Sequence, residues 1–383
     1  MDQLNERIAS CTEYVTGKIN GSDGKRHIVL CGGTGCLSNH SQEIREKFEK
    51  LLEEKGLSDK VTVNQVGCFG FCSQGPFVKI YPEDTLYRMV KIEDVEEIIE
   101  TDIIGRTVVE HLLYEEPSTG QKVARQDDIN FYKKQRRVAL YACGVINPEK
   151  IDEALGMGAF QGLKRALSMD RQAVIDEVLS SGLRGRGGAG FPTGRKWQFA
   201  YNSEGDEKYV VCNGDEGDPG AFMDRSILEG NPLAVIEGMM IAGYAIGAQN
   251  GYFYVRAEYP IAVKRLRIAI AQARELGLLG EHILGTDFSF DCHLRLGAGA
   301  FVCGEETALL NSIEGKRGMP RPRPPFPAVK GLWGKPTIIN NVETLACVPY
   351  ILREGASKFA SVGTEKSKGT KVFALGGKVN NVG

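Results

Sequence analysis

Short apolar runs alternate with amphipathic stretches over the first hundred residues. Four runs have the length and the β-branched or aromatic content of strands. They cover residues 26–30, 61–66, 76–81 and 87–90. The stretch 42–55 carries its apolar side chains on one helical face, and a second helix is expected over 93–100. The order strand, helix, three strands, helix is typical of a small α/β domain of thioredoxin-like type.

The hydrophobic pattern weakens after the first hundred residues and later becomes regular again. The intervening part contains an acidic turn and a basic run, which predict a solvated linker over 106–136. Farther along, 170–179 has a helical pattern and 208–212 the pattern of a strand. We therefore expect a first domain over 1–105 and a larger α/β domain over 137–368.

The composition is that of a folded chain with two or three domains. Its 383 residues are 42% hydrophobic and 25% charged, which excludes an intrinsically disordered chain. The 47 basic and 49 acidic side chains give a net charge of −2, so no basic excess points to nucleic acid. The charged N-terminus differs from a signal peptide, and the uncharged run 238–255 has the pattern of a packed helix followed by a strand. We expect a cytoplasmic protein without a membrane span.

Four of the ten cysteines are spaced like the ligands of one site. Cys31 and Cys36 follow the first predicted strand as C-x4-C, and Cys68 and Cys72 follow the second as C-x3-C. Loops at one edge of a sheet can meet, so four thiolates could converge, and this set suits a [2Fe–2S] cluster. Structural zinc usually takes C-x2-C pairs, and a reducing compartment disfavours disulfides. Zinc and unligated thiols stay open as alternatives, and the other six cysteines are expected to be buried apolar side chains.

The stretch 181–197 concentrates glycine and cationic side chains. It contains a G-x-G-x-x-G match at Gly185, Gly187 and Gly190. A Rossmann fingerprint would need a strand before the match and an acidic residue about 20 positions later. Here a helix is predicted before it, and Val210 stands at the later position. The backbone N–H groups of such a loop can nevertheless wrap a phosphate. Four cationic side chains could assist, namely Arg184, Arg186, Arg195 and Lys196.

Three later clusters add carboxylates, amides and further glycines. The first spans 213–220, the second, 297–307, places two glutamates after a glycine-rich turn, and the third, 337–344, follows a proline-rich run. Groups at the carboxyl ends of parallel strands lie where α/β proteins form ligand sites. These clusters could bind the polar groups of a flavin ring, a ribose or a phosphate.

Five motifs in this order resemble one known family: GRGGAGFPTGRKW, NGDEGDPG, CGEETALL, PPFP and INNVET. The set resembles the NADH-oxidising flavoprotein subunit of respiratory complex I (51 kDa-type), a module that also occurs in NAD-linked hydrogenases and formate dehydrogenases. The N-terminal domain resembles thioredoxin-like [2Fe–2S] ferredoxins. The fusion is most similar to the flavoprotein (beta) subunit of electron-bifurcating [FeFe]-hydrogenases from anaerobes.

The resemblance implies a domain order. A Rossmann-like FMN- and NADH-binding α/β domain would follow the ferredoxin domain, and residues 369–383 would begin a ubiquitin-like SLBB domain. The family continues into a [4Fe–4S] site beyond that domain. We therefore expect the chain to be a fragment, with a [4Fe–4S] cluster in the missing C-terminal part.

The resemblance also implies which residues hold the cofactors. Those expected around FMN are Gly185, Arg186, Gly187, Gly188, Gly190, Lys196, Asn213, Asp215, Glu216, Gly304, Glu305, Ile339, Asn340, Asn341 and Thr344. Those expected around NAD(H), stacked over the flavin, are Phe191, Phe199, Asp218, Phe301, Glu305, Glu306 and Phe326. The candidate catalytic residues are Glu216 and Glu305, which would orient the rings and tune the flavin. The family often has Tyr at position 301 and Glu at position 218, and these departures bear on nucleotide affinity and on the choice between NAD and NADP.

These features predict an NADH:acceptor oxidoreductase (diaphorase) subunit. It would transfer hydride reversibly between NAD(H) and FMN and single electrons to iron–sulfur clusters, within an electron-bifurcating hydrogenase complex. The expected partners are an [FeFe]-hydrogenase catalytic subunit, a small thioredoxin-like [2Fe–2S] subunit and ferredoxin as the external carrier. The alternatives are the flavoprotein subunit of an NAD-dependent formate dehydrogenase or of another complex I-like enzyme and, from another class, a zinc-stabilised redox adaptor.

Overall fold

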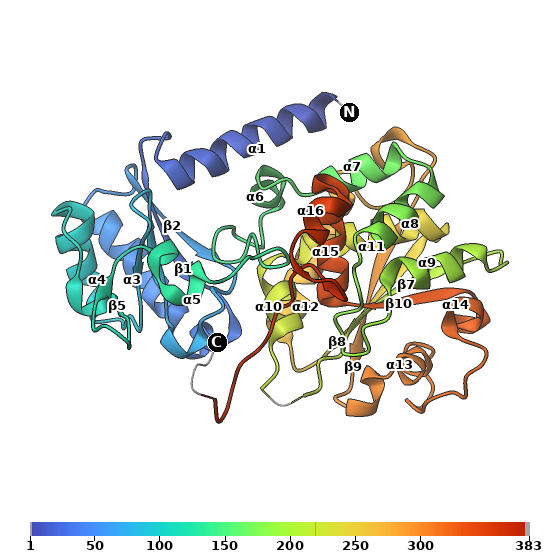
Figure 1. Cartoon of the computed structure of the whole chain (residues 1–383). Coiled ribbons are helices and arrows are strands. Elements are labelled where there is room, and N and C mark those ends of the chain that lie inside the picture. Colours follow the sequence, from blue (N-terminus) through green and yellow to red (C-terminus); the bar gives the residue numbers. More distant parts are fainter. Residues whose placement is uncertain (1, 219, 380–383) are drawn as a thin grey trace. The chain divides into compact units, whose positions relative to one another are not determined.

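The computed structural model describes residues 2–218 and 220–379, which form two compact units (Figure 1). The first unit contains residues 2–157 and the second contains residues 158–378. Each unit has its own four-stranded sheet, which confirms the predicted mixed α/β class. Of residues 369–383, where a ubiquitin-like domain is expected to begin, 380–383 lie outside the described residues.

The sheet of the first unit mixes parallel and antiparallel pairs. Its strands are β1 (Arg26–Cys31), β2 (Val61–Val66), β3 (Val78–Tyr81) and β4 (Thr85–Tyr87), in the order β2-β1-β3-β4. β1 and β2 are parallel, whereas β3 is antiparallel to both β1 and β4. The fourth strand ends earlier than the predicted 87–90, because Met89 has a φ of 49° and leaves the extended conformation.

Helices of the first unit complete the predicted order. They are α2 (Thr34–Ser38), α3 (Ser41–Glu54) and α4 (Asp94–Glu97), which continues as the π-helix η2 (Ile98–Ile104). Ile44 and Phe48 of α3 are buried in the same core as Ile28 and Ile80 of the sheet. This core therefore joins the helix predicted at 42–55 to the strands predicted beside it.

One N-terminal helix has no counterpart among the predicted elements. This helix, α1 (Asp2–Asn20), packs against α6 (Ile151–Gly156). Lys18 and Glu153 form a buried ion pair of 2.6 Å between them. Gly156 permits the close approach, since a Cβ there would lie 2.4 Å from the carbonyl oxygen of Cys11. A buried ion pair therefore stabilises the contact between α1 and α6.

Residues 106–136, expected to be a solvated linker, pack within the first unit. Their short elements are η3 (Glu110–Leu112), β5 (Tyr114–Glu115), β6 (Lys122–Val123), η4 (Gln126–Asp128) and α5 (Asn130–Lys133). Their buried apolar side chains are Val109, Leu112, Leu113, Tyr114, Ile129 and Tyr132. Because these side chains join the cores of the first sheet, the compact unit extends to Met157.

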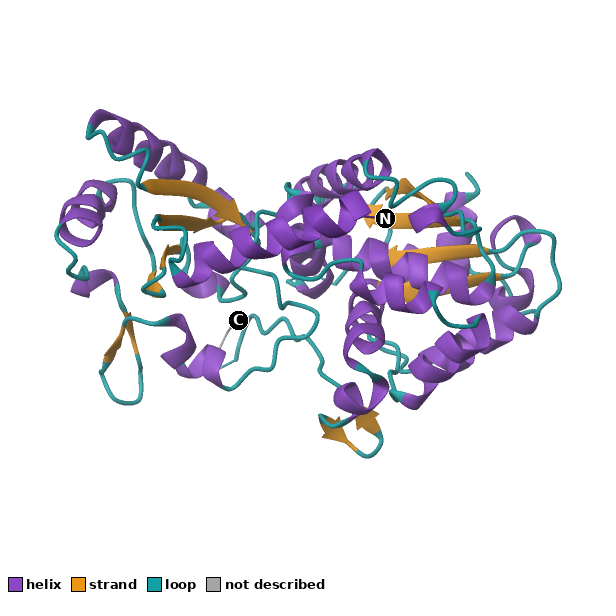
Figure 2. Ribbon diagram, turned by 90° about the horizontal axis from the view of Figure 1, so that it is seen from above, coloured by secondary structure: helices purple, strands orange, loops and turns teal. Residues whose placement is uncertain are grey.

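The second unit contains a wholly parallel sheet. Its strands are β7 (Tyr209–Gly214), β8 (Asn250–Arg256), β9 (Asp291–Gly297) and β10 (Thr337–Asn341), in the order β10-β7-β8-β9. Figure 2 shows these strands among helices. The run 238–255 forms the end of the buried helix α11 (Pro232–Ile246) and then β8, as the sequence predicts. α11 packs on β7 and on α15 (Val342–Glu354).

The remaining elements of the second unit are mostly helical. They are α7 (Gln161–Leu167), α8 (Arg171–Ser180), α9 (Thr193–Asn202), α10 (Met223–Gly230), α12 (Pro260–Glu275), η5 (Ile283–Gly285), η6 (Phe301–Gly304), α13 (Glu306–Ile313), α14 (Pro327–Lys330), η7 (Leu332–Gly334), α16 (Ala356–Ala360), β11 (Gly363–Thr364) and β12 (Ser367–Lys368). None of the described helices combines the length and apolar content that a bilayer crossing requires.

Candidate cofactor sites

A cavity of about 780 Å³ lies in the second unit, at the carboxyl ends of β7 and β10. The structure brings fourteen of the predicted site residues to its wall. They are Gly185, Gly187, Gly190, Phe191, Lys196, Phe199, Asn213, Gly304, Glu305, Glu306, Phe326, Ile339, Asn340 and Asn341. Residues from each of the five sequence motifs therefore line the cavity, and the proline-rich motif contributes Phe326 and Pro327.

The glycine loop between α8 and α9 forms one wall of this cavity. The Gly185 amide donates to the carbonyl of Phe191 at 2.8 Å, which closes the loop into a narrow turn. Gly188 and Gly190 have φ values of 105° and 64°, in the region that favours glycine. A Cβ on Gly187 would lie 3.1 Å from the Cβ of Asn341, so the bare backbone forms the surface there.

Charged side chains surround another part of the cavity. The Lys196 ammonium donates to the carbonyl of Ile339 at 3.0 Å and lies 3.4 Å from Glu306. Glu305 caps α13 and accepts hydrogen bonds from the backbone of Thr307 and Ala308, both at 2.9 Å. Burial opposes ionisation of Glu305, but these bonds and the Thr307 hydroxyl lower its pKa. Glu305 is therefore held as an anion.

The four predicted cysteine ligands lie together in the first unit. Cys31 and Cys36 come from the end of β1 and from α2, whereas Cys68 and Cys72 come from the loop after β2. The Cys68 and Cys72 sulfurs are 3.9 Å apart. Hydrogen bonds with Cys31 and Cys72 lower the pKa of the Cys68 thiol, as do the Gly70 amide and the charge of Arg137, although burial opposes ionisation.

Glycine also makes room around these sulfurs. A Cβ on Gly75 would lie 2.5 Å from the Cys36 sulfur, and one on Gly33 would lie 3.2 Å from the Cys68 sulfur. Larger residues at either position would occupy the space beside the thiols. The remaining cysteines (Cys11, Cys143, Cys212, Cys292, Cys303 and Cys347) are buried and form no disulfide in the described chain.

Comparisons with known proteins bear on the domains that carry both sites. Residues 178–350 match the Nuo51 FMN-binding domain, and residues 19–102 match the thioredoxin-like [2Fe–2S] ferredoxin domain. The chain combines these two domains. The matched residues include most of the motifs that resemble these families, and FMN and [2Fe–2S] are the cofactors of the matched domains.

Similar proteins are longer than the part they share with this chain. The NADP-reducing hydrogenase subunit HndC of Solidesulfovibrio fructosivorans is 60% identical over 251 residues, which cover 66% of this chain and 51% of that protein. An NADH-quinone oxidoreductase subunit of Aquifex aeolicus is 51% identical over 233 residues, covering 61% of this chain and 54% of that protein. The chain therefore spans about half the length of these relatives.

A solved structure is similar to the chain over nearly its whole length. The crystal structure of an NAD+-reducing [NiFe]-hydrogenase in the H2-reduced state aligns with a TM-score of 0.57 at 27% identity. The alignment covers 98% of this chain and 63% of that chain.

The residues of the FMN-binding domain fit a group rich in polar atoms. Asp215 Oδ2 is buried and accepts no hydrogen bond from the described residues. A Cβ on Gly304, which lines the cavity, would lie 3.6 Å from this oxygen. Burial raises the pKa of Asp215. An unpartnered buried acceptor beside the cavity is suited to an N–H or O–H group of a flavin.

Seven predicted residues do not line the cavity: Arg186, Gly188, Asp215, Glu216, Asp218, Phe301 and Thr344. The Glu216 carboxylate accepts from the backbone of Asp224 (3.2 Å) and Arg225 (3.1 Å), at the start of α10. Asp218 is exposed, and the exposed Phe301 is 70% accessible. The roles assigned to these side chains remain predictions.

Arg186 and Thr344 support the glycine loop from behind. The Arg186 amide donates to the Thr344 hydroxyl at 2.9 Å. The Arg186 side chain is buried and donates to the carbonyls of Lys368 (2.8 Å) and Thr370 (3.1 Å). The guanidinium is thus engaged with residues 368–370.

Sequence reasoning missed some cavity residues. Arg323 lines the cavity and forms ion pairs with Glu306 (2.7 Å) and Glu305 (3.9 Å). Its position directly before the proline-rich run was the available signal. The other missed residues are Ala189, Asn202, Ser203, Pro327, Ala328, Val329 and Thr337, and nothing in their type singles them out.

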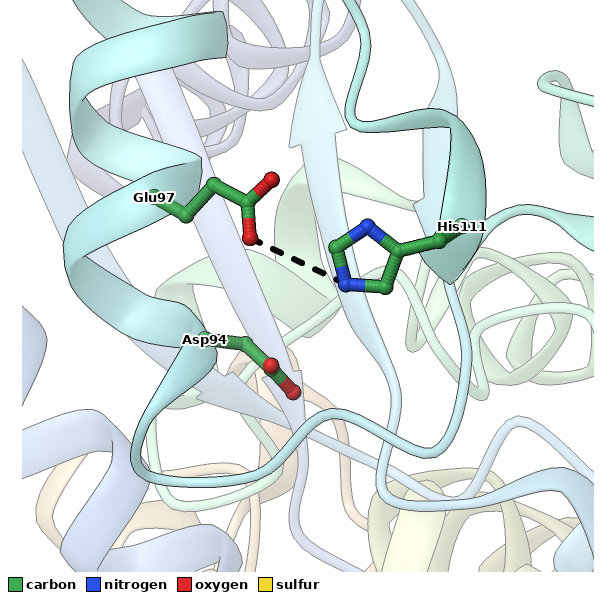
Figure 3. Close-up of side chains that lie close together, drawn as sticks. All are labelled: Asp94, Glu97 and His111. Carbon is green, nitrogen blue, oxygen red and sulfur yellow. Dashed lines mark ion pairs between the residues drawn. The ribbon is translucent and has the colours of Figure 1, made fainter.

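Asp94, Glu97 and His111 form a cluster on the first unit that the motifs did not indicate (Figure 3). One oxygen or nitrogen of each lies within 4.8 Å of the others, and His111 and Glu97 are 3.7 Å apart. Two of the three side chains are exposed, and no second feature at the cluster points to a bound ion.

Proposed function

We propose that the chain is part of an NAD(P)H-oxidising flavoprotein subunit that exchanges electrons with iron–sulfur carriers. The observation that carries this proposal is the cavity in the FMN-binding domain, which is lined by a glycine loop and the ionised Glu305, with a buried acceptor of Asp215 next to the lining residue Gly304. Bound FMN would supply reversible hydride exchange with a nicotinamide and single-electron exchange with iron–sulfur clusters.

The chain's own residues would bind and orient the two cofactors. The amides of Gly185 to Gly190 and the ammonium of Lys196 would hold the flavin phosphate. Asp215 and Asn213 would accept and donate hydrogen bonds at the ring or ribityl chain. Phe191, Phe199 and Phe326, all at least 42% exposed, would stack on a dinucleotide.

The carboxylates would act by position and charge. Glu305, held as an anion beside Arg323, would orient a bound nucleotide and repel additional phosphate charge. Glu216 accepts backbone hydrogen bonds at the start of α10 and would act on the flavin through the loop it fixes. Neither residue needs to transfer a proton in a hydride step.

The proposed setting is a cytoplasmic hydrogenase complex. The support is the 60% identity to HndC, which is named as an NADP-reducing hydrogenase subunit. An [FeFe]-hydrogenase subunit, a small [2Fe–2S] subunit and ferredoxin would be the partners, and a [4Fe–4S] cluster outside this chain would carry electrons between them. Electron bifurcation would require such partners.

A complex I-like or formate dehydrogenase setting is the second candidate. The 51% identity to an NADH-quinone oxidoreductase subunit supports the complex I-like setting. Purification of the native complex separates the candidates: a bound hydrogenase subunit supports the first, and a molybdenum- or tungsten-containing subunit supports a formate dehydrogenase.

An anaerobic titration tests the flavin chemistry. Protein loaded with FMN should lose its flavin absorption band when NADH or NADPH is added. In Gly187→Val, the new side chain meets Asn341, so FMN affinity should fall at least tenfold, as for a blocked subsite. Gly376→Val is the matched control, because a Cβ at Gly376 meets nothing within 4 Å. A flavin that stays oxidised with both nucleotides in FMN-loaded protein would count against the proposal.

The cysteine assignment has its own test. Cys68→Ser should remove the EPR signal of the reduced [2Fe–2S] cluster and lower bound iron in proportion. Cys11→Ser, at a buried cysteine distant in sequence from the four, should keep both. Bound zinc in place of iron would favour the redox adaptor instead.

A further inference from the structure

A segment beyond the matched ferredoxin domain packs onto the cysteine site. We call residues 126–146 the cap segment. Ile129 and Tyr132 of this segment belong to the buried apolar cluster that includes Cys31 and Cys36. The cap segment is therefore part of the wall around the thiols.

Two further contacts fix the cap segment to the loop that carries Cys72. Phe131 stacks on Phe71, with ring centroids 4.1 Å apart and planes 16° apart. The carbonyl of Ile146 accepts from the Gly67 amide at 3.2 Å. The loop is thus held at both of its ends.

Tyr132 carries a polar group into this apolar wall. Its side chain is 6% exposed, and its hydroxyl has no hydrogen-bond partner among the described residues. Burial raises the pKa of this hydroxyl, and the neighbouring thiolates of Cys31, Cys68 and Cys72 raise it further. Arg137 follows the end of α5 by four residues on the same segment, and its positive charge favours the ionised forms of both Tyr132 and Cys68.

We propose that the cap segment encloses the [2Fe–2S] site and that Tyr132 and Arg137 raise the reduction potential of its cluster. Reduction by one electron adds one negative charge to the cluster and its thiolates. The positive charge of Arg137 and the unpartnered O–H dipole of Tyr132, both on the segment that packs against the thiols, stabilise that added charge. The inference rests on the proposed cysteine ligation, and the two residues act as positioning and tuning groups that are not ligands.

A redox titration of the full chain tests the proposal. The cluster is reduced stepwise with dithionite in the presence of mediators, and the EPR signal gives the midpoint potential. In Arg137→Gln the ratio of oxidised to reduced cluster at the wild-type midpoint should rise about tenfold, equivalent to about 59 mV toward negative potential. Tyr132→Phe should shift the potential in the same direction.

Matched variants separate charge and hydrogen bonding from packing. Lys134→Gln removes an exposed cation three residues away, and Tyr114→Phe removes a hydroxyl that interacts with Glu116 and Arg88. Both should keep the wild-type potential. Arg137→Lys should restore most of the shift seen in Arg137→Gln, because it restores the charge.

Each outcome decides the matter. Lower potentials in both test variants, with wild-type iron content, support the proposal. Unchanged potentials with full iron content overturn it, as does a loss of iron without a change in the potential of the remaining clusters, which indicates packing alone. A wild-type chain that assembles no [2Fe–2S] cluster overturns the cysteine assignment itself.

Discussion

Trp197 donates its indole N–H to the side-chain oxygen of Asn340 at 2.9 Å. Trp197 is fully buried in α9, directly after the glycine loop, and Asn340 is a buried residue of β10 that lines the cavity. The bond therefore joins the first and the last of the five motifs. It explains why a bulky aromatic follows a loop that is otherwise made of glycines and cations.

Trp197→Phe should loosen this wall of the flavin site. The indole N–H is lost, and the buried Asn340 oxygen is left without its donor, at a cost of about 1–3 kcal/mol. We expect lower stability of the second unit and about tenfold weaker FMN binding, measured by thermal unfolding and by flavin fluorescence. Trp333→Phe, at an indole that is 44% exposed, is the control. Equal FMN affinity in the two variants would contradict the role of the bond.

Arg186→Gln should release residues 366–372 from the glycine loop. Arg186 donates to the carbonyls of Lys368 and Thr370 and lies 3.8 Å from the buried Glu343, whose carboxylate accepts from the Val372 amide. The change leaves these two carbonyls without their donors, which costs about 1–3 kcal/mol for each buried group.

Limited trypsin digestion measures this release. Cleavage after Lys366, Lys368 and Lys371 should become several-fold faster in Arg186→Gln than in the wild type. The exposed Arg195 supplies the matched control, and Arg195→Gln should digest like the wild type apart from losing its own cleavage site. Identical cleavage rates in both variants would show that Arg186 does not hold the segment.

The sequence predicted the features that depend on local pattern. The strands at 26–30 and 61–66, the helix at 42–55 and the mismatch of the glycine loop with a Rossmann fingerprint all follow from spacing, and the structure has them. The loop lies between α8 and α9 instead of after a strand. Because parallel strands end at the same edge of a sheet, the motifs that follow them are expected to lie close together.

Features that depend on distant contacts could not be predicted in this way. The Arg186 guanidinium was expected at the cofactor, but it is held by carbonyls more than 180 positions away. The stretch 106–136 has the polarity of a linker, yet a few apolar side chains such as Val109 and Tyr132 place it in the core. α1 buries only a few side chains, and one of them is the charged Lys18, which pairs with Glu153.

Lys18→Met should detach α1 from α6. The change leaves Glu153 buried without its cation, which costs about 3–5 kcal/mol, whereas Arg7→Met removes the exposed Arg7–Asp152 pair at a cost of about 0–1 kcal/mol. Both tryptophans lie in the second unit, so the loss should appear in far-UV circular dichroism and not in tryptophan fluorescence. The double variant Lys18→Met with Glu153→Gln should recover much of the stability. Equal losses in the two single variants would contradict the difference in burial.

Glu237 should make the second unit less stable as the pH rises from about 4.5 to about 7. Burial raises the pKa of this fully buried carboxyl to about 7, although hydrogen bonds from the Phe160 and Leu163 amides favour its anion. Below pH 4.5 the carboxyl is protonated in both the folded and the unfolded chain, and its contribution to stability is fully present. Between the two pKa values only the folded chain keeps the proton, so each pH unit lowers the free energy of unfolding by about 1.4 kcal/mol, and above pH 7 the contribution is lost.

Glu237→Gln should reduce the fall in the free energy of unfolding with pH by about 1.4 kcal/mol per pH unit, which is the contribution of one titrating proton. It should not abolish the slope, because burial also raises the pKa of Glu343 to about 7. The amide nitrogen of glutamine cannot accept from the Phe160 or Leu163 amide, so the variant should also be less stable at every pH. Urea unfolding followed by tryptophan fluorescence between pH 5 and pH 7 gives both quantities for the second unit alone. An unchanged slope would mean that Glu237 is ionised in the folded chain, with the two backbone donors outweighing its desolvation.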